Sequence, residues 1–233
     1  MSEPMFSVSG LNSGYGQSQV IHDLNLNVAK QEIVAVMGRN GMGKTTLFKT
    51  LMGIIPAVGG GISVDGKQLE GMESYQRVQQ GLAYVPQGRM IFPHMTVLEN
   101  IQTGLPFAAH GAVPEELFVL FPVLYDMRSR KGGNLSGGQQ QQLAIARALA
   151  TNPKVLLLDE PTEGIQPSII KDIAKTLKEI RSLRQLTILV SEQVLSFTLD
   201  IADRFFVIDK GKFVYEDQRA NVNEKTISQY LSI

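Results

Sequence analysis

Short apolar segments recur along the chain without the alternation of apolar and polar residues that marks a half-exposed strand. They span residues 33–37, 82–85, 155–158, 187–190 and 205–208. Unalternating runs of this length are typical of strands that are buried on both faces, as in a parallel sheet. The pattern therefore predicts a central, mostly parallel β-sheet.

A helical pattern lies between two of these segments. Ile169, Ile173, Leu177 and Ile180 recur at spacings of four, four and three residues, which places them on one face of an amphipathic helix. We expect the chain to enter this helix at Ser168, which follows a proline. The alternation of strand and helix patterns predicts a doubly wound α/β core.

Two regions depart from this alternation. The N-terminal third has shorter strand patterns near residues 6–11, 24–28 and 61–64, which predicts an antiparallel β layer, and Gly59-Gly60-Gly61 predicts a turn before a strand. Residues 88–151 show no strong strand signal and are expected to be mostly helical. We interpret residues 1–233 as a single domain, with a nucleotide-binding core over about 1–88 and 152–233 and a helical subdomain over about 89–151.

Composition narrows the class of protein. The 233 residues are 43% hydrophobic and 19% charged, as in a foldable globular chain. Lys+Arg and Asp+Glu balance at 22 each, so net charge favours neither nucleic acid nor an anionic membrane surface as a partner. The absence of cysteine excludes disulfides and thiolate metal sites. We find no signal-peptide pattern and no apolar run long enough to span a membrane, so we expect membrane contact through another protein.

The segment GRNGMGKT, residues 38–45, fits the phosphate-loop pattern G-x-x-x-x-G-K-[ST] between a predicted strand and a predicted helix over residues 45–53. Converging backbone N–H groups and the helix N-terminus favour phosphate there. Lys44 would reach the β- and γ-phosphates of ATP and Thr45 would ligate Mg²⁺. The candidate nucleotide-binding residues are Gly38, Arg39, Asn40, Gly41, Gly43, Lys44, Thr45 and Thr46. A phosphate loop alone leaves kinases, GTPases, helicases and motors open.

Two acids follow the apolar run of residues 155–158. Asp159 and Glu160 come at the carboxyl end of a predicted buried strand, which is where open α/β sheets bind ligands. Asp159 would hold Mg²⁺ through its water shell, and Glu160 would orient or deprotonate the attacking water. The alternative is a strand that simply ends in solvated acids.

The segment LSGGQ, residues 135–139, precedes a helical run and offers a hydroxyl and glycine amides at a helix N-terminus. Together with the phosphate loop and VLLLDE, it makes the chain resemble the ATP-binding cassette (ABC) ATPases along nearly its whole length. The resemblance implies that the signature residues meet the γ-phosphate bound to a second ATPase subunit, so that two subunits sandwich two nucleotides. The matching residues are Ser136, Gly137, Gly138 and Gln139.

The resemblance extends to further positions, with two departures. Tyr15 matches the aromatic that stacks on adenine, and Gln87 matches the glutamine that contacts Mg²⁺ and the attacking water. Gln166 stands where the family usually has aspartate, and Gln193 stands where it has its switch histidine. A non-hydrolysing scaffold therefore stays open as an alternative, although the lysine, threonine and both acids are present. We expect Gln193 to contact the γ-phosphate beside Glu160.

Longer segments indicate the branch of the family. YVPQGRMIFPHMTVLEN, residues 84–100, resembles the smaller ATPase subunits of branched-chain amino acid importers, and DEPTEGIQPSIIKDI, residues 159–173, most resembles the urea importers of that branch. The resemblance implies a bacterial importer with two ATPase subunits, two transmembrane permease subunits and a periplasmic solute-binding protein. The ATPase would lie at the cytoplasmic face of the inner membrane, where residues 89–121 would receive a helix of the permease.

Alternative cargoes are branched-chain amino acids or short amides. A cassette of DNA repair or translation is a different class, but members of that class usually carry tandem cassettes, long insertions or basic arms, which this chain lacks.

Overall fold

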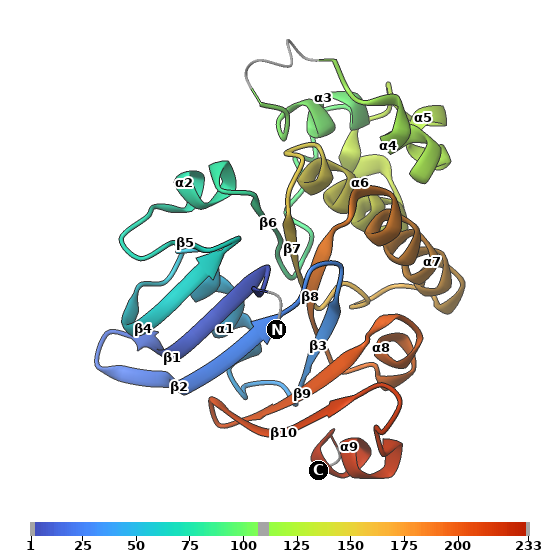
Figure 1. Ribbon diagram of the computed structural model, residues 1–233. Helices are drawn as coiled ribbons and strands as arrows, with labels where there is room; N and C mark the ends of the chain where they lie inside the picture. Colours follow the sequence, from blue (N-terminus) through green and yellow to red (C-terminus); the bar gives the residue numbers. More distant parts are fainter. Residues whose placement is uncertain (1–2, 107–111, 232–233) are drawn as a thin grey trace.

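In the computed structural model, the described residues, 3–106 and 112–231, form two sheets covered by helices (Figure 1). The larger sheet has six strands in the order β10-β9-β3-β8-β7-β6. Its strands are β3 (Ile33–Met37), β6 (Leu82–Val85), β7 (Val155–Asp159), β8 (Thr187–Glu192), β9 (Arg204–Asp209) and β10 (Lys212–Gln218). All neighbours pair in parallel except β10, which is antiparallel to β9. The predicted parallel core is confirmed.

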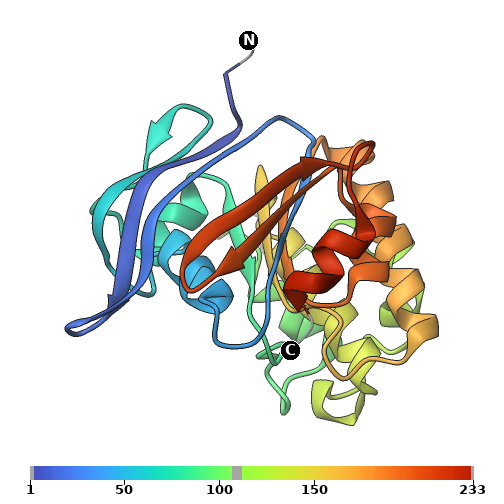
Figure 2. The same cartoon turned by 90° about the horizontal axis from the view of Figure 1, so that it is seen from below.

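Burial on both faces explains why these strands lack alternation. Along β3, the side chains of Ile33 and Ala35 belong to one hydrophobic cluster, whereas those of Val34 and Val36 belong to another. The first cluster lies between the sheet and the helices α3, α6, α7 and α8, and the second lies against α1 and the antiparallel sheet. Figure 2 shows β9 and β10, the orange-red strands, side by side at one edge of the larger sheet. The parallel sheet, whose carboxyl edge carries the site described below, is therefore packed on both of its faces.

The smaller sheet has the antiparallel order β2-β1-β4-β5 and forms the predicted N-terminal layer. Its strands are β1 (Phe6–Tyr15), β2 (Ser18–Val28), β4 (Ala57–Val64) and β5 (Lys67–Gln68). The prediction of a turn at the three glycines was wrong, because they lie inside β4. Gly60 has a φ of 92°, and a Cβ there would come 2.4 Å from the carbonyl oxygen of Gly10. The glycines let β4 bend closely against β1 at a shift in strand register.

The helices are α1 (Lys44–Leu51), α2 (Ser74–Gln79), α3 (Val97–Gln102), α4 (Glu115–Leu120), α5 (Pro122–Asp126), α6 (Gly137–Leu149), α7 (Pro167–Arg184), α8 (Leu195–Ile201) and α9 (Glu224–Leu231), with a 3-10 turn η2 (Gly132–Asn134). The predicted start of α7 at Ser168 was wrong. Gln166 is the N-cap and Pro167 occupies the first turn, where its missing N–H has no cost.

Four helices, α3 to α6, and η2 lie within the stretch expected to be helical, and Figure 1 shows α3, α4 and α5 beyond one end of the parallel sheet. Residues 107–111 of that stretch, including His110, lie outside the described residues. Nowhere in residues 3–106 and 112–231 is there a helix with the length and apolar character needed to cross a membrane. The division into a core and a helical subdomain stays a prediction.

Candidate ATP-binding and hydrolysis site

The phosphate loop connects β3 to α1 at the carboxyl edge of the parallel sheet. Gly43 caps α1 with a φ of 108°, a backbone conformation that favours glycine. Gly38 is packed so closely that a Cβ would lie 2.5 Å from the carbonyl oxygen of Ile208. The loop borders a cavity of about 180 Å³, lined by Val20, Asn40, Gly41, Gly43, Lys44, Thr45, Thr46, Gln87 and Glu160. The loop thus places a helix N-terminus, which favours anions, at the border of this cavity.

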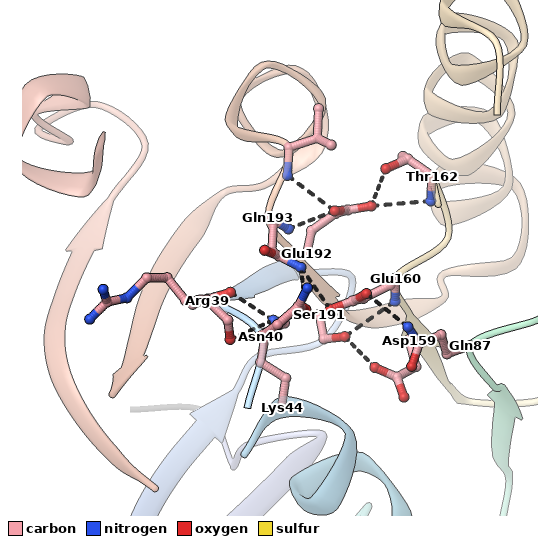
Figure 3. Close-up of polar contacts among 12 residues, drawn as sticks. Arg39, Asn40, Lys44, Gln87, Asp159, Glu160, Thr162, Ser191, Glu192 and Gln193 are labelled. Carbon is pink, nitrogen blue, oxygen red and sulfur yellow. Dashed lines mark hydrogen bonds and ion pairs between the residues drawn. The ribbon is translucent and has the colours of Figure 1, made fainter. Parts of the chain in front are cut away.

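Lys44 is the buried cation of this cavity. Its Nζ donates to the carbonyl oxygens of Gly38 at 2.6 Å and Arg39 at 3.1 Å, and it lies 3.0 Å from Glu160 Oε1. The side chains of Lys44 and Glu160 are only 3% and 9% exposed. The guanidinium of Arg39 points away from this group in Figure 3. Arg39 therefore contributes its backbone to the cluster.

Asp159 ends β7 with a side chain that is only 1% exposed. Its Oδ1 accepts a hydrogen bond from Ser191 Oγ at 2.5 Å, and its Oδ2 accepts one from Tyr84 Oη at 3.1 Å. The Thr45 hydroxyl bonds to the same carboxyl. Burial raises the pKa of Asp159, while these hydrogen bonds oppose that rise because they stabilise the carboxylate. Neutral hydrogen-bond donors thus stabilise the negative charge of the Asp159 carboxylate at the edge of the cavity.

Glu160 lies where the chain leaves the sheet, in a left-handed conformation with φ 47°. Its amide donates to the Ser191 carbonyl oxygen at 3.0 Å. Its Oε2 accepts from Gln87 Nε2 at 3.1 Å, and its Oε1 accepts from Gln193 Nε2 at 3.2 Å. Together with Lys44, these side chains converge on the Glu160 carboxylate from three separate segments (Figure 3).

Gln193 directly follows β8 and spans the mouth of the phosphate loop. Besides Glu160, its Nε2 contacts Asn40 Oδ1 at 2.6 Å. Gln166, the other departure from the family pattern, is the N-cap of α7 and is exposed. Of the two replacements, Gln193 is therefore the one that lies in the cluster.

The signature residues lie apart from the cavity, at the start of α6. Ser136 caps the helix, accepting a bond from the Gln139 amide at 3.4 Å, while Gln139 Oε1 accepts from the Ser136 amide at 2.9 Å. Gly138 is packed against Ile169. None of Ser136, Gly137, Gly138 and Gln139 is among the described residues that line the cavity. Within one chain, then, the signature does not complete this site.

Tyr15 also lies outside the cavity lining. It ends β1 at the turn into β2, and its side chain is 52% exposed. Val20, on the same hairpin, reaches the cavity and packs beside Gly43. The hairpin therefore borders the phosphate loop, and Tyr15 presents an exposed aromatic side chain at its end.

Three contributors escaped sequence reasoning. Tyr84 and Ser191 bond to Asp159, and their place at the carboxyl ends of β6 and β8 is the signal that could have found them. Arg89 donates to the Glu163 carbonyl oxygen at 3.0 Å and packs against Gly137. Arg89 thereby links the segment after Gln87 to the signature and to the segment after Glu160.

Comparison with known proteins identifies the family. The ABC transporter family matches residues 21–163, more than half of the chain. The chain belongs to the ABC transporter family. It is 38% identical to the high-affinity branched-chain amino acid transport ATP-binding protein BraG of Pseudomonas aeruginosa, over 97% of this chain and 99% of BraG. It is 34% identical to the lipopolysaccharide export system ATP-binding protein LptB of Haemophilus influenzae, over 90% of this chain and 89% of LptB.

A solved structure agrees with the fold. The ADP conformation of an ATP-binding cassette from an ABC transporter is 26% identical, with a TM-score of 0.80 over 99% of this chain and 95% of that chain. This ABC transporter chain is thus an ATPase of the type predicted from its motifs. The relatives support the branched-chain amino acid interpretation better than the urea interpretation.

Proposed function

We propose that the chain is the ATP-hydrolysing subunit of an importer of the branched-chain amino acid type. The observation that carries ATP hydrolysis is the convergence of Lys44, Gln87 and Gln193 on Glu160 at the mouth of the phosphate loop, and the similarity to BraG supports the importer type. A strand that ended in solvated acids would leave Glu160 exposed and unpaired. Its burial among three donors supports a chemical role.

The oxygen donors around the cavity suit Mg²⁺. Thr45, Asp159 and Gln87 supply a hydroxyl, a carboxylate and an amide oxygen, and hard cations prefer such ligands. Among the described residues, no group of three His, Cys, Asp or Glu side chains could hold a metal without other ligands. Nucleotide-site Mg²⁺ needs no such group, because it is bound through one or two carboxylates together with phosphates and water. Bound with ATP, it would neutralise charge on the β- and γ-phosphates.

The residues then divide the work of hydrolysis. Lys44 and the loop amides bind phosphate oxygens, and Glu160 takes the proton of the attacking water as general base. Gln87 and Gln193 orient the Glu160 carboxylate, because an amide donates a hydrogen bond but does not accept a proton near neutral pH. Glu160 therefore carries the base role alone, and Gln193 is a positioning contact.

A second subunit would complete each site. At the start of α6, Ser136 is exposed and Gly137 and Gln139 are half-buried, and all of them lie outside the cavity of their own chain. In a head-to-tail dimer of cassettes, Ser136 and the amides of Gly137 and Gly138 would face the partner's γ-phosphate. Tyr15 would stack on adenine at the exposed end of its hairpin. Two permease subunits and a periplasmic binding protein would supply the membrane passage and the cargo.

The first experiment measures ATP turnover of the assembled transporter and of a Glu160→Gln assembly. We expect turnover in the first and none above background in the second. Equal turnover in both would contradict the proposed base.

The cargo needs a separate experiment. Uptake of labelled leucine, urea and a short amide would be measured in a strain that lacks the gene, with and without the restored chain. We expect restoration of leucine uptake. Urea is the second candidate, favoured by the segment of residues 159–173, and selective restoration of urea uptake would replace the first proposal.

A further inference from the structure

Glu192, the last residue of β8, is a buried carboxylate that no motif accounts for. Its side chain is 2% exposed. Burial of a carboxylate is costly unless hydrogen bonds replace its hydration. Here both oxygens are occupied, and the donors come from two different segments of the chain (Figure 3).

One oxygen faces the segment that follows Glu160. Glu192 Oε1 accepts from the Thr162 amide at 3.1 Å and from the Thr162 hydroxyl. Because Ser191 already holds the amide of Glu160, the chain is fixed both at Glu160 and two residues later. This double attachment holds the left-handed turn that aims the Glu160 side chain.

The other oxygen faces the segment that carries Gln193. Glu192 Oε2 accepts from the backbone amides of Gln193 at 2.6 Å and Val194 at 3.1 Å. These bonds fix the backbone where it leaves the sheet and approaches α8. The direction of the Gln193 side chain toward Glu160 and Asn40 depends on that backbone.

We propose that Glu192 is a positioning residue for ATP hydrolysis, which acts by locking Gln193 and Thr162 to each other. It holds the two chain segments on either side of the Glu160 carboxylate in one geometry. The role rests on the proposed function, since it acts through the contact between Gln193 and Glu160. It differs from that function in needing no contact between Glu192 and nucleotide.

The decisive variant is Glu192→Gln. The amide has the same shape, but only one of its two terminal groups accepts hydrogen bonds, so either the Thr162 side or the Gln193 side faces an N–H₂. We expect the assembled transporter to lose turnover by about 10- to 100-fold, as misplacement near reacting groups does. ATP affinity, measured by titration, should stay within about threefold, because the groups that bind phosphate are unchanged.

A milder variant tests the hydrogen bonds between Glu192 and Thr162. Thr162→Val removes the hydroxyl donor and keeps the amide donor, so turnover should fall less than in Glu192→Gln, again with ATP affinity retained. Thr176→Val is the matched control, since the Thr176 hydroxyl donates to the Asp172 carbonyl oxygen within α7, away from the Glu160 site. Its turnover should equal that of the wild type. If Glu192→Gln fails to fold, Thr162→Val alone decides.

A double-mutant cycle separates positioning from general stability. Because Glu192 acts in part through Gln193, Glu192→Gln should slow turnover by a clearly smaller factor in the Gln193→Ala background than in the wild type. Multiplying effects, or wild-type turnover in folded Glu192→Gln, would overturn the proposal. Either result would leave the ATPase function intact as long as Glu160→Gln abolishes turnover. If Glu160→Gln did not lower turnover, that result would instead contradict the proposed function itself.

Discussion

The ammonium of Lys44 lies 3.0 Å from Glu160 Oε1, so the cation of the phosphate loop and the proposed base form a buried ion pair. The two roles are therefore coupled. A phosphate entering the loop competes with Glu160 for the lysine, and a change at either residue alters the charge that the other meets.

Lys44→Ala tests the cation. Removal of a charged donor from the loop should weaken ATP binding by about 10- to 100-fold, the effect of one hydrogen bond to a charged group. It also leaves the Glu160 carboxylate buried without its partner. Calorimetric titration with ATP measures the affinity, and an unchanged dissociation constant would contradict the assignment of the loop.

Glu160→Gln tests the base from the other side of the pair. Turnover should fall by about 100-fold or more, because the amide cannot accept the proton. ATP affinity should rise, since Lys44 no longer has a competing carboxylate. A sizing column with ATP then checks whether the variant forms a stable dimer. A variant that bound ATP more weakly would show that Glu160 does not compete for Lys44.

Asp159 gives a stability prediction with a defined sign. Burial raises its pKa above the ordinary value of 3.8, so the folded protein holds the proton more tightly than the unfolded chain does. Its contribution to stability therefore falls as pH rises from 3.8 through the raised pKa, and the cost persists at neutral pH. Asp159→Asn should unfold at higher denaturant than the wild type at pH 7, with the gap shrinking on acidification.

The measurement is denaturant unfolding of the nucleotide-free protein with a chelator present. The exposed Asp172→Asn is the matched control and should show no such gap. A less stable Asp159→Asn at pH 7 would mean that the bonds from Ser191 and Tyr84 outweigh the cost of burial.

The sequence predicted positions correctly where the order of the strands determines which residues lie at the same edge of the sheet. The apolar runs are the strands of the parallel sheet, and parallel strands bring their carboxyl ends to one edge. Lys44, Asp159 and Glu160 could therefore be grouped before any coordinates. The role of each in catalysis stays a prediction.

The contacts that sequence reasoning missed depend on packing between distant segments. Nothing in the order of residues indicates that Glu192 accepts hydrogen bonds from Thr162. A buried carboxylate and its neutral donors have no characteristic spacing along a sequence. The triple glycine was misread for a related reason, since a turn and a bent strand have the same local composition. Only the close approach of Gly60 to β1 distinguishes them.

Gly38→Ala tests the packing of the phosphate loop. The added Cβ would meet backbone at the Ile208 carbonyl oxygen, which cannot move aside as a side chain can. We expect a loss of about 1–3 kcal/mol in the free energy of unfolding. Gly59→Ala is the matched control, because the nearest atom to its Cβ is 4.0 Å away on the Asn12 side chain. Equal unfolding midpoints for the two variants would show that the loop relaxes.

Substitution of Gln193 tests whether this residue positions the Glu160 carboxylate. Its amide contacts both Glu160 and Asn40, so it ties the proposed base to the phosphate loop. Gln193→Ala should lower single-turnover hydrolysis in the assembled transporter, by about 10²–10³-fold at most, the effect of one polar transition-state contact. Gln193→His should stay active, because imidazole also offers an N–H donor. Wild-type rates in Gln193→Ala would make this glutamine a surface residue, and the base would then be oriented by Gln87 and Lys44 alone.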